Sequence, residues 1–405
     1  MARQYSFPSN HWDWPVKLTH HHAVRAGDLI FTGGQVDLDP QGTVRNIGDL
    51  TTQCRNSMVY METLFQDLGV GFDDLVRLVV YFVGDATDEA RLLDLLADII
   101  GPRARPTITM IPMPELCYPD MLTEIEGVAM RATDGTKIPK QCFQLPNLPA
   151  LPQAFSHVVR AGDMVFTSDL SARNAQGEVD HPGDLTAQTR ITMERLQQAL
   201  AEAGADLGDV VKLSTFASAD NTPCQDEAAA LRATYFAAPG PSVTELPLAR
   251  SPHPDLVTKI SATAMHGAGA KHTATPDGHW TWSAPRPYSQ GNRVGTVLHI
   301  GGQMALDTDA IARHPGDMVA QTRIAMESIA RILAEFDATL DDVVKVTTFY
   351  QGSASAEALH ENLLIRSNSY TAPGPATTGI PVPALTTQGI VIAIEVIAVL
   401  DRIQT

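Results

Sequence analysis

Cysteine is scarce in this 405-residue chain, and its four cysteines form no C-x-x-C pair. Neither a disulfide framework nor a zinc knuckle is therefore indicated. The sequence has no run of about eighteen uncharged apolar residues, and its N-terminal stretch lacks the apolar core of a secretory signal. These absences predict a cytoplasmic protein that neither spans nor binds a membrane.

Positive charge is also in short supply. The chain has 29 Lys and Arg against 46 Asp and Glu, a formal net charge of −17. Such an acidic chain offers no broad basic surface to a phosphate backbone, so we expect no nucleic-acid partner. A small anionic substrate remains possible, because one local arginine can hold a carboxylate whatever the overall charge.

The chain does contain a long internal repeat. The segment that begins at Arg25 (RAGD) returns at Arg160 and, in looser form, at Arg293, and the Gly-Asp-Leu motif at Gly48 returns at 183 and 316 with the same two spacings. A period of this length corresponds to a whole small domain. We therefore expect three tandem domains over residues 1–135, 150–267 and 281–405, with linker-like segments around 133–152 and 267–280.

Each repeat shows the same order of expected elements. Each repeat begins with two strands, the second of which enters a tight turn (DLIFTGGQV in the first copy). A long amphipathic helix, a strand rich in β-branched residues, a second helix, a Pro/Gly corner and two final strands follow. The order β-β-α-β-α-β-β predicts an α+β domain with helices on one face of a sheet. The bare face needs a partner, so we expect a pseudo-threefold body with sheets inward and helices outward.

The third repeat carries a recognisable succession of motifs. It reads Pro287-Tyr-Ser-Gln-Gly291, then Ile300-Gly-Gly-Gln303, then AQTR, DVVKVTTF and a terminal IEVIAV. This succession resembles the RidA (YjgF-like) family of enamine/imine deaminases, and each copy covers nearly a full member. The resemblance implies chorismate mutase-like domains that assemble as a trimer with ligand clefts between subunits. Here the trimer would be one polypeptide, present as a monomeric pseudo-trimer or a dimer of such chains.

The resemblance also implies a reaction and its residues. Family members hydrolyse a 2-imino or 2-enamino acid to the oxo acid and ammonia without a cofactor, using an arginine for the carboxylate, a glutamate beside the water, and a tyrosine and a glycine turn along the cleft. The matching residues of the first copy are Arg105, Glu126, Gly33 and Gly34, with His20 at the tyrosine position and Thr107 at a cysteine position.

The other two copies depart from this pattern. The second copy has Gly240 at the arginine position, Ser261 at the glutamate position, Phe155 at the tyrosine position and Asp169 in the glycine turn. The third copy keeps Tyr288, Asn362 and Glu395 but has Gly374 at the arginine position. We therefore expect at most one fully equipped cleft per chain, to which Tyr288 or Asn362 contributes from a neighbouring copy.

Elementary chemistry supports these roles. Arg105 follows a Pro/Gly corner and can present a planar fork to a carboxylate. Glu126 lies in an apolar strand, where a carboxylate must pair or shift its pKa, so it can activate water; Glu124, on the same side of that strand, is interpreted as a surface residue. His20 or His22 is a candidate acid near neutral pH, or a member of a polar surface cluster.

Two further patterns receive structural interpretations. Consecutive residues of an extended chain alternate in direction, so the three histidines at 20–22 cannot easily converge on one ion, and we expect no metal site. A basic residue recurs at Arg77, Lys212 and Lys345, at the start of an apolar strand, where we expect its apolar stem to be buried and its charge to reach solvent.

The leading hypothesis is a hydrolase that deaminates an imine or enamine conjugated to a carboxylate. By analogy with the family, a dicarboxylate such as 2-aminomuconate from aromatic compound catabolism is a candidate substrate. One alternative is a ring-opening amidohydrolase of the cyanuric acid hydrolase or barbiturase type, although no Ser and Lys recur together in all three copies. The other is a ligand-binding or interaction scaffold without catalysis.

Overall fold

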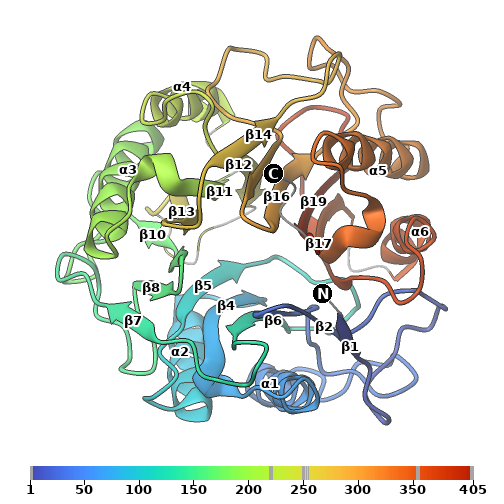
Figure 1. Ribbon diagram of the computed structural model, residues 1–405. Coiled ribbons are helices and arrows are strands. Elements are labelled where there is room, and N and C mark those ends of the chain that lie inside the picture. Colours follow the sequence, from blue (N-terminus) through green and yellow to red (C-terminus); the bar gives the residue numbers. More distant parts are fainter. Residues whose placement is uncertain are drawn as a thin grey trace.

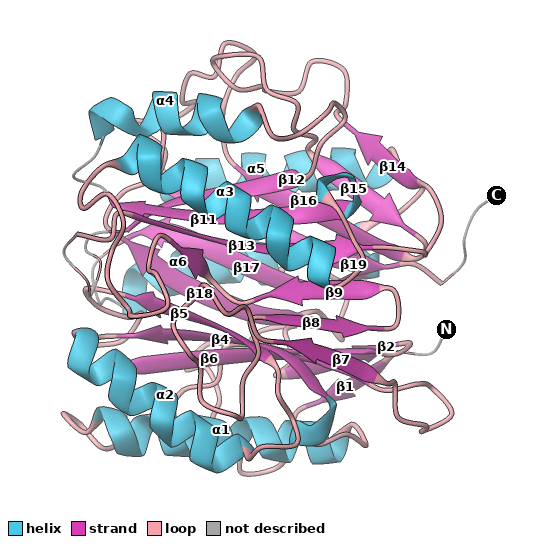
Figure 2. Ribbon diagram, turned by 90° about the vertical axis from the view of Figure 1, so that its left-hand side faces the viewer, coloured by secondary structure: helices cyan, strands magenta, loops and turns pink. Residues whose placement is uncertain are grey.

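The computed structural model describes residues 3–218, 222–248, 251, 253, 255–352 and 356–401. Three similar domains surround a common centre, with their sheets inside and their helices outside (Figure 1). Each domain is a mixed sheet covered by two helices, and Figure 2 shows the helices α1 to α4 on the outer surface of the strands. The predicted α+β architecture of three tandem domains is therefore confirmed.

Domain 1 contains the strands and helices β1 (Gln4–Ser6), β2 (Ala23–Ala26), β3 (Leu29–Thr32), α1 (Leu50–Asp67), β4 (Leu75–Phe82), α2 (Ala86–Ile100), β5 (Thr107–Pro112) and β6 (Thr123–Met130). Domain 2 contains β7 (Lys140–Phe143), β8 (Val158–Ala161), β9 (Met164–Thr167), β10 (Leu170–Ser171), α3 (Leu185–Glu202), β11 (Val210–Ser218), α4 (Thr222–Ala233), β12 (Ser242–Leu248) and β13 (Thr258–Met265). Domain 3 contains β14 (Lys271–Ala274), β15 (Gly291–Val294), β16 (Val297–Gln303), α5 (Met318–Ala334), β17 (Val343–Gln351), α6 (Ala356–Ser367), β18 (Ala376–Val382) and β19 (Ile392–Val399).

The Gly-Asp-Leu/Met repeat marks the beginning of the long helix in each domain. The side chains of Asp49, Asp184 and Asp317 each accept a hydrogen bond from a backbone N–H in the first turn of α1, α3 and α5. An aspartate at this position satisfies an N–H group that the helix itself leaves without a partner. The motif thus encodes the same helix start three times.

The segments between the repeats are more structured than the sequence indicates. The stretch expected to link domains 1 and 2 contains β7, and the stretch expected to link domains 2 and 3 contains β14. Each of these strands pairs antiparallel with the first predicted strand of the following domain. The polar flanks of these strands, which contain Pro and Gly, resemble linkers in sequence. A short edge strand pairs with only one neighbour and needs little apolar patterning, so the sequence does not reveal it.

The three sheets pack on one another through apolar side chains. One buried cluster draws members from all three domains, among them Val24, Phe31, Val76, Val159, Phe166, Val211, Val294, Val297 and Val344. The uncovered sheet faces therefore bury one another, as the sequence predicts. No helix in the described part of the chain is both long and apolar enough to cross a bilayer.

The same contact joins each pair of domains. The turn after the second predicted strand of one domain meets the backbone of the strand that follows the second helix of its neighbour: Gly34 N–H donates to Thr377 O, and Asp169 N–H donates to Ile108 O. In the third interface a β-carbon on Gly301 would lie 2.5 Å from Val243 O. Glycine at that position permits the close approach of two backbones.

Replacing Gly301 by alanine is expected to lower the free energy of unfolding by about 1–3 kcal/mol, because the added methyl group meets rigid backbone atoms of domain 2. The measurement is denaturant unfolding of the whole chain. Gly71→Ala is the matched control, since nothing lies within 4 Å of its β-carbon position, and a change below about 0.5 kcal/mol is expected there. Equal losses in both variants would contradict the close packing of domains 2 and 3.

Candidate functional site

Arg105 belongs to the interface between domains 1 and 2. Its backbone oxygen accepts a hydrogen bond from Cys142 Sγ at 3.6 Å, and the N–H of Ser156 donates to the adjacent Pro106 oxygen at 2.9 Å. Arg105 is half-buried, has φ of 50°, and its Nε is buried without a hydrogen-bond partner in the described part of the chain. Thr107 is fully buried, and its hydroxyl donates to Val76 O within domain 1.

Glu126 belongs to a different interface, between domains 3 and 1. Its Oε2 lies 2.7 Å from Lys345 Nζ and accepts a hydrogen bond from Thr378 Oγ1 at 2.6 Å. The expectation that Arg105 and Glu126 line one cleft is therefore wrong. In a ring, each domain contacts its two neighbours through two different sides. Arg105 precedes β5, the edge strand that faces domain 2, whereas Glu126 on β6 contacts Thr378 of domain 3.

The interface between domains 3 and 1 holds another arginine, which is completely buried. Arg366 of α6 donates from Nε (3.0 Å) and Nη2 (2.9 Å) to Asn362 Oδ1, and from Nη1 to Thr377 Oγ1 at 3.0 Å. All three bonds go to neutral oxygens, and no carboxylate in the described residues forms an ion pair with Arg366. Burial lowers the pKa of Arg366 to about 10, so it remains a cation at neutral pH.

The corresponding arginine of domain 2 has a carboxylate partner that Arg366 does not have among the described residues. Arg232 occupies the corresponding position of α4, and it forms an ion pair with Glu245 of the adjacent strand. The residue of domain 3 that corresponds to Glu245 is Gly379, whose missing β-carbon would point toward Leu359 and lie 3.8 Å from Arg366 Nη2. Domain 3 thus keeps the guanidinium and has lost its internal anion.

Two carboxyl groups of β6 accompany Arg366 at this interface. Glu124 is 4% exposed, so its interpretation as a surface residue is wrong. Burial, and next the charge of Glu126, raise the pKa of Glu124 to about 8, while the backbone N–H of Gly379 donates to it. Glu126 has its charge balanced by Lys345. A neutral acid therefore stands beside an ion-paired carboxylate, an arrangement that separates acid from base.

His20 lines a hollow of about 300 Å³ together with Phe7 and residues 13–18. Burial, followed by the charge of Arg366, lowers the pKa of His20 to about 3, so the imidazole is neutral at pH 7. Its Nδ1 bonds Pro375 O at 3.1 Å, and its Nε2 has no partner in the described part of the chain. The expected acid at this interface is therefore Glu124 rather than His20, and His20 offers a proton acceptor.

Two tyrosine hydroxyl groups near Arg366 are also buried without hydrogen-bond partners among the residues that the structure describes. Tyr370 packs against His20 with ring centroids 5.6 Å apart. Burial raises the pKa of Tyr350, and the nearby charges of Glu124 and Arg366 act on it in opposite directions. The hydroxyl oxygens of both tyrosines are buried with no hydrogen-bond partner in the described residues. Buried polar groups are rarely left unpaired, so these groups mark the cluster as a candidate ligand site. Gly33 and Gly34 border it, because their turn contacts Thr377.

The remaining predicted residues lie at the interface between domains 2 and 3. Glu395 pairs with Lys212 at 2.7 Å and accepts from Thr244 at 2.5 Å. Tyr288 is buried against Phe236 and Trp282. Tyr288 and Asn362 therefore belong to different clefts, and only Asn362 reaches the cluster around Arg366.

The interface between domains 1 and 2 also encloses a cavity, of about 230 Å³. Its charged groups already neutralise one another: Lys259 lies 2.9 Å from Asp169 and 3.9 Å from Glu89. Arg105 is not among the residues that line it. Arg173 also lines the cavity and forms no ion pair with a described residue. Its charge and that of Lys259 are formally balanced by Glu89 and Asp169, so the cavity has no excess of positive charge.

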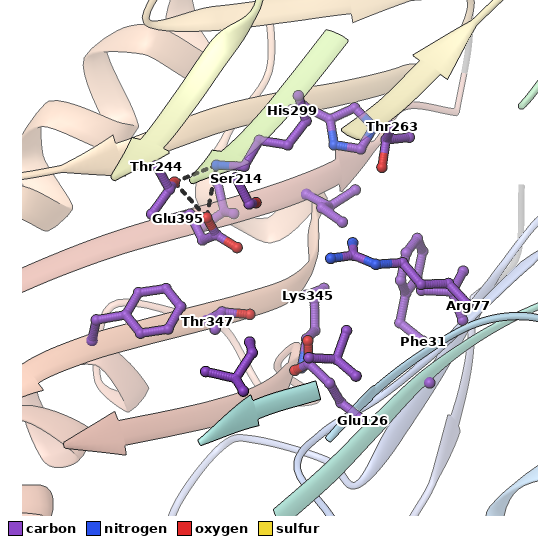
Figure 3. A pocket seen from close by; sticks show the side chains of 18 of the residues that line it. Phe31, Arg77, Glu126, Ser214, Thr244, Thr263, His299, Lys345, Thr347 and Glu395 are labelled. Carbon is purple, nitrogen blue, oxygen red and sulfur yellow. Dashed lines mark hydrogen bonds and ion pairs between the residues drawn. The ribbon is translucent and has the colours of Figure 1, made fainter. Parts of the chain in front are cut away.

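A third cavity lies where the three domains meet, and we call it the axial chamber (Figure 3). Lys212 and Lys345 line it and are buried in ion pairs with glutamates of the next domain, so the expectation that their charges reach solvent is wrong. Each lysine also contacts a threonine hydroxyl, of Thr244 or Thr378. The corresponding residue of domain 1 is Arg77, so three equivalent Ser–Lys pairs are absent from this part of the described chain.

Sequence reasoning missed Arg366 and assigned Glu124 to the surface. Both carry a signal: Arg366 lies one helical turn after Asn362, on the same face of α6, and Glu124 lies two residues before Glu126, on the same face of β6. The loss of the Arg232–Glu245 pair in domain 3 becomes visible only when the helices and strands of the repeats are aligned.

Comparison with known proteins identifies the family. The profile of a family described as Endoribonuclease L-PSP matches the chain three times, over residues 16–131, 147–265 and 281–400. The chain belongs to this family. It is the RidA (YjgF-like) family whose motifs the sequence carries in triplicate.

Individual RidA relatives correspond to one domain each. A RutC family protein of Pyrococcus abyssi is 32% identical over 122 residues, which is 29% of this chain and 93% of that protein. The 2-iminobutanoate/2-iminopropanoate deaminase of Mus musculus is 29% identical over 92 residues, 18% of this chain and 68% of that protein. A crystal structure of a chorismatase resembles the three-domain body, with a TM-score of 0.52, 12% identity, and coverage of 80% of this chain and 93% of that one. At this identity the likeness concerns the fold alone.

Proposed function

We propose that this RidA family chain hydrolyses a 2-imino or 2-enamino carboxylate to the oxo acid and ammonia, at the interface between domains 3 and 1. One observation carries the proposal: Arg366, a completely buried guanidinium with only neutral hydrogen-bond partners, shares this interface with a protonated carboxyl and an ion-paired carboxylate. Such a guanidinium binds a substrate carboxylate in a bidentate manner.

The proposed chemistry uses groups already described. The neutral carboxyl of Glu124 protonates the enamine carbon or the imine nitrogen, which makes the C=N carbon electrophilic. Glu126 accepts a proton from the attacking water and passes it to the nitrogen of the resulting carbinolamine. Ammonia then leaves, and the hydroxyl proton returns to Glu124 as the oxo acid forms. The unpaired His20 Nε2 and the two tyrosine hydroxyls bind the polar groups of the substrate. The deaminase activity of the mouse relative supports the same reaction class here.

The direct test measures ammonia release from freshly generated 2-iminobutanoate and from 2-aminomuconate, as a dicarboxylate candidate. Both the wild type and Arg105→Ala are expected to accelerate release above the spontaneous rate, because Arg105 lies at another interface. An active wild type with an inactive Arg105→Ala variant would contradict this location and place the active site at the interface between domains 1 and 2. Opening of cyclic amides without ammonia release from imines would instead favour the amidohydrolase alternative.

A further inference from the structure

The axial chamber contains one more cation than its carboxylates can neutralise. Arg77, Lys212 and Lys345 occupy equivalent positions of β4, β11 and β17, as their parallel pairing with the neighbouring strands shows, and all three line the chamber. Glu126 and Glu395 supply two negative charges, one to each lysine. The formal balance leaves a charge of one positive unit on Arg77.

The missing third carboxylate can be traced to one substitution. The position held by Glu126 in domain 1 and by Glu395 in domain 3 is Ser261 in domain 2, as the strand registers show. The Ser261 hydroxyl is buried without a hydrogen-bond partner in the described part of the chain. The same is true of Thr109, which corresponds to the threonines that bond Glu126 and Glu395. The third unit thus keeps the cation and the threonine and lacks the anion.

The Arg77 side chain points into the axial chamber. Figure 3 shows its side chain entering the chamber from domain 1, between Lys345 and His299. No described residue forms an ion pair or a hydrogen bond with its guanidinium, and His299 Nε2 is also buried without a described partner. The chamber has about 50 Å³ of free space, enough for roughly four waters, so a small ion fits.

We propose that the axial chamber binds a small monovalent anion, such as a halide or formate, against Arg77. The anion replaces the carboxylate that Ser261 has lost and neutralises the third cation of the pseudo-threefold set. The two existing ion pairs show the chemistry that the chamber accepts, since each joins a cation of one domain to a carboxylate of the next. Binding therefore links domains 1 and 2 in the same way.

Bromide is the probe that tests this proposal. Crystals of the full chain soaked in sodium bromide are expected to show an anomalous peak beside the Arg77 guanidinium. In solution, about 0.1 M bromide or formate is expected to raise the Tm of the wild type by about 2 °C more than that of Ser261→Glu, which carries its own carboxylate. Arg77→Met is expected to lose the same extra shift.

The opposite outcomes are equally clear. No bromide peak in the wild-type chamber, or equal Tm shifts in wild type and Ser261→Glu, would overturn the proposal. Ser261→Glu places a carboxylate where domains 1 and 3 already have one, so this variant is expected to fold. The comparison with the wild type therefore remains possible if Arg77→Met does not fold. The readouts involve no substrate, so they are independent of the proposed deaminase activity.

Discussion

Replacing Arg366 by methionine is expected to lower kcat/KM for a 2-iminocarboxylate by about 100-fold or more, mostly through KM. The guanidinium is proposed to hold the substrate carboxylate in both the ground state and the transition state, and loss of such uniform binding raises KM. A charge-assisted, fully desolvated contact of this kind is worth about 2–5 kcal/mol. Steady-state ammonia release measures the effect.

Arg232→Met is the matched control for this variant. Arg232 occupies the same helical position in domain 2 but is paired with Glu245, and it lies away from the interface of domains 3 and 1. We expect it to keep its activity and to lose more stability than Arg366→Met, because its removal leaves a half-buried carboxylate unpaired. Equal activity losses in both variants would indicate a structural role for the arginine.

A carboxylate introduced at Gly379 extends the same argument. Gly379→Glu restores in domain 3 the pair that Arg232 and Glu245 form in domain 2, at the cost of displacing the flexible end of Leu359. The new carboxylate is expected to occupy Arg366 and to weaken substrate binding about as strongly as Arg366→Met does. A folded Gly379→Glu variant with wild-type kcat/KM would contradict the proposed role of Arg366.

Replacing Glu124 by glutamine is expected to lower kcat by about 10²–10⁴-fold, because an amide keeps the size of the neutral acid but cannot donate its proton. The wild-type activity should depend on pH in a matching way. Burial and the charge of Glu126 raise the pKa of Glu124 to about 8, so kcat is expected to fall about tenfold for each pH unit above 8. A pH–rate profile of both proteins measures this, and a wild-type rate that stays flat from pH 7 to about 10 would contradict the assignment.

The pH dependence of the free energy of unfolding distinguishes a catalytic role of Glu124 from a structural one. The pKa of Glu124 is higher in the folded chain, at about 8, than the ordinary 4.5 of a glutamate. Its protonation therefore favours the folded state fully below about pH 4.5, and this contribution is lost as the pH rises toward 8. Glu124→Gln does not titrate, so near pH 8 it is expected to be at least as stable as the wild type despite its loss of activity.

The sequence was sufficient for the fold because the same signals occur three times. The Asp49, Asp184 and Asp317 helix starts, the β-branched strands and the glycine turns each act locally, within a few residues. The edge strands β7 and β14 escaped prediction, since a short strand with one partner needs no apolar pattern of its own.

The candidate site was less accessible to sequence reasoning. Glu126, His20, Asn362, Gly33 and Gly34 are brought to one interface. Arg105 is at another, although it lies in the same repeat as Glu126. A repeat identifies which residue types are present, but it does not say which neighbour each side of a domain will meet.

The sequence alone determined the three repeated domains, their α+β order, the family and the net negative charge, because each follows from local pattern or from composition. Only the tertiary structure decided which charges meet. The closure of the ring pairs Lys345 with Glu126 and Lys212 with Glu395, and it leaves Arg366 and Arg77 without described carboxylates. Electrostatic pairing depends on distance and burial across the interfaces, and these quantities exist only once the three sheets have packed together.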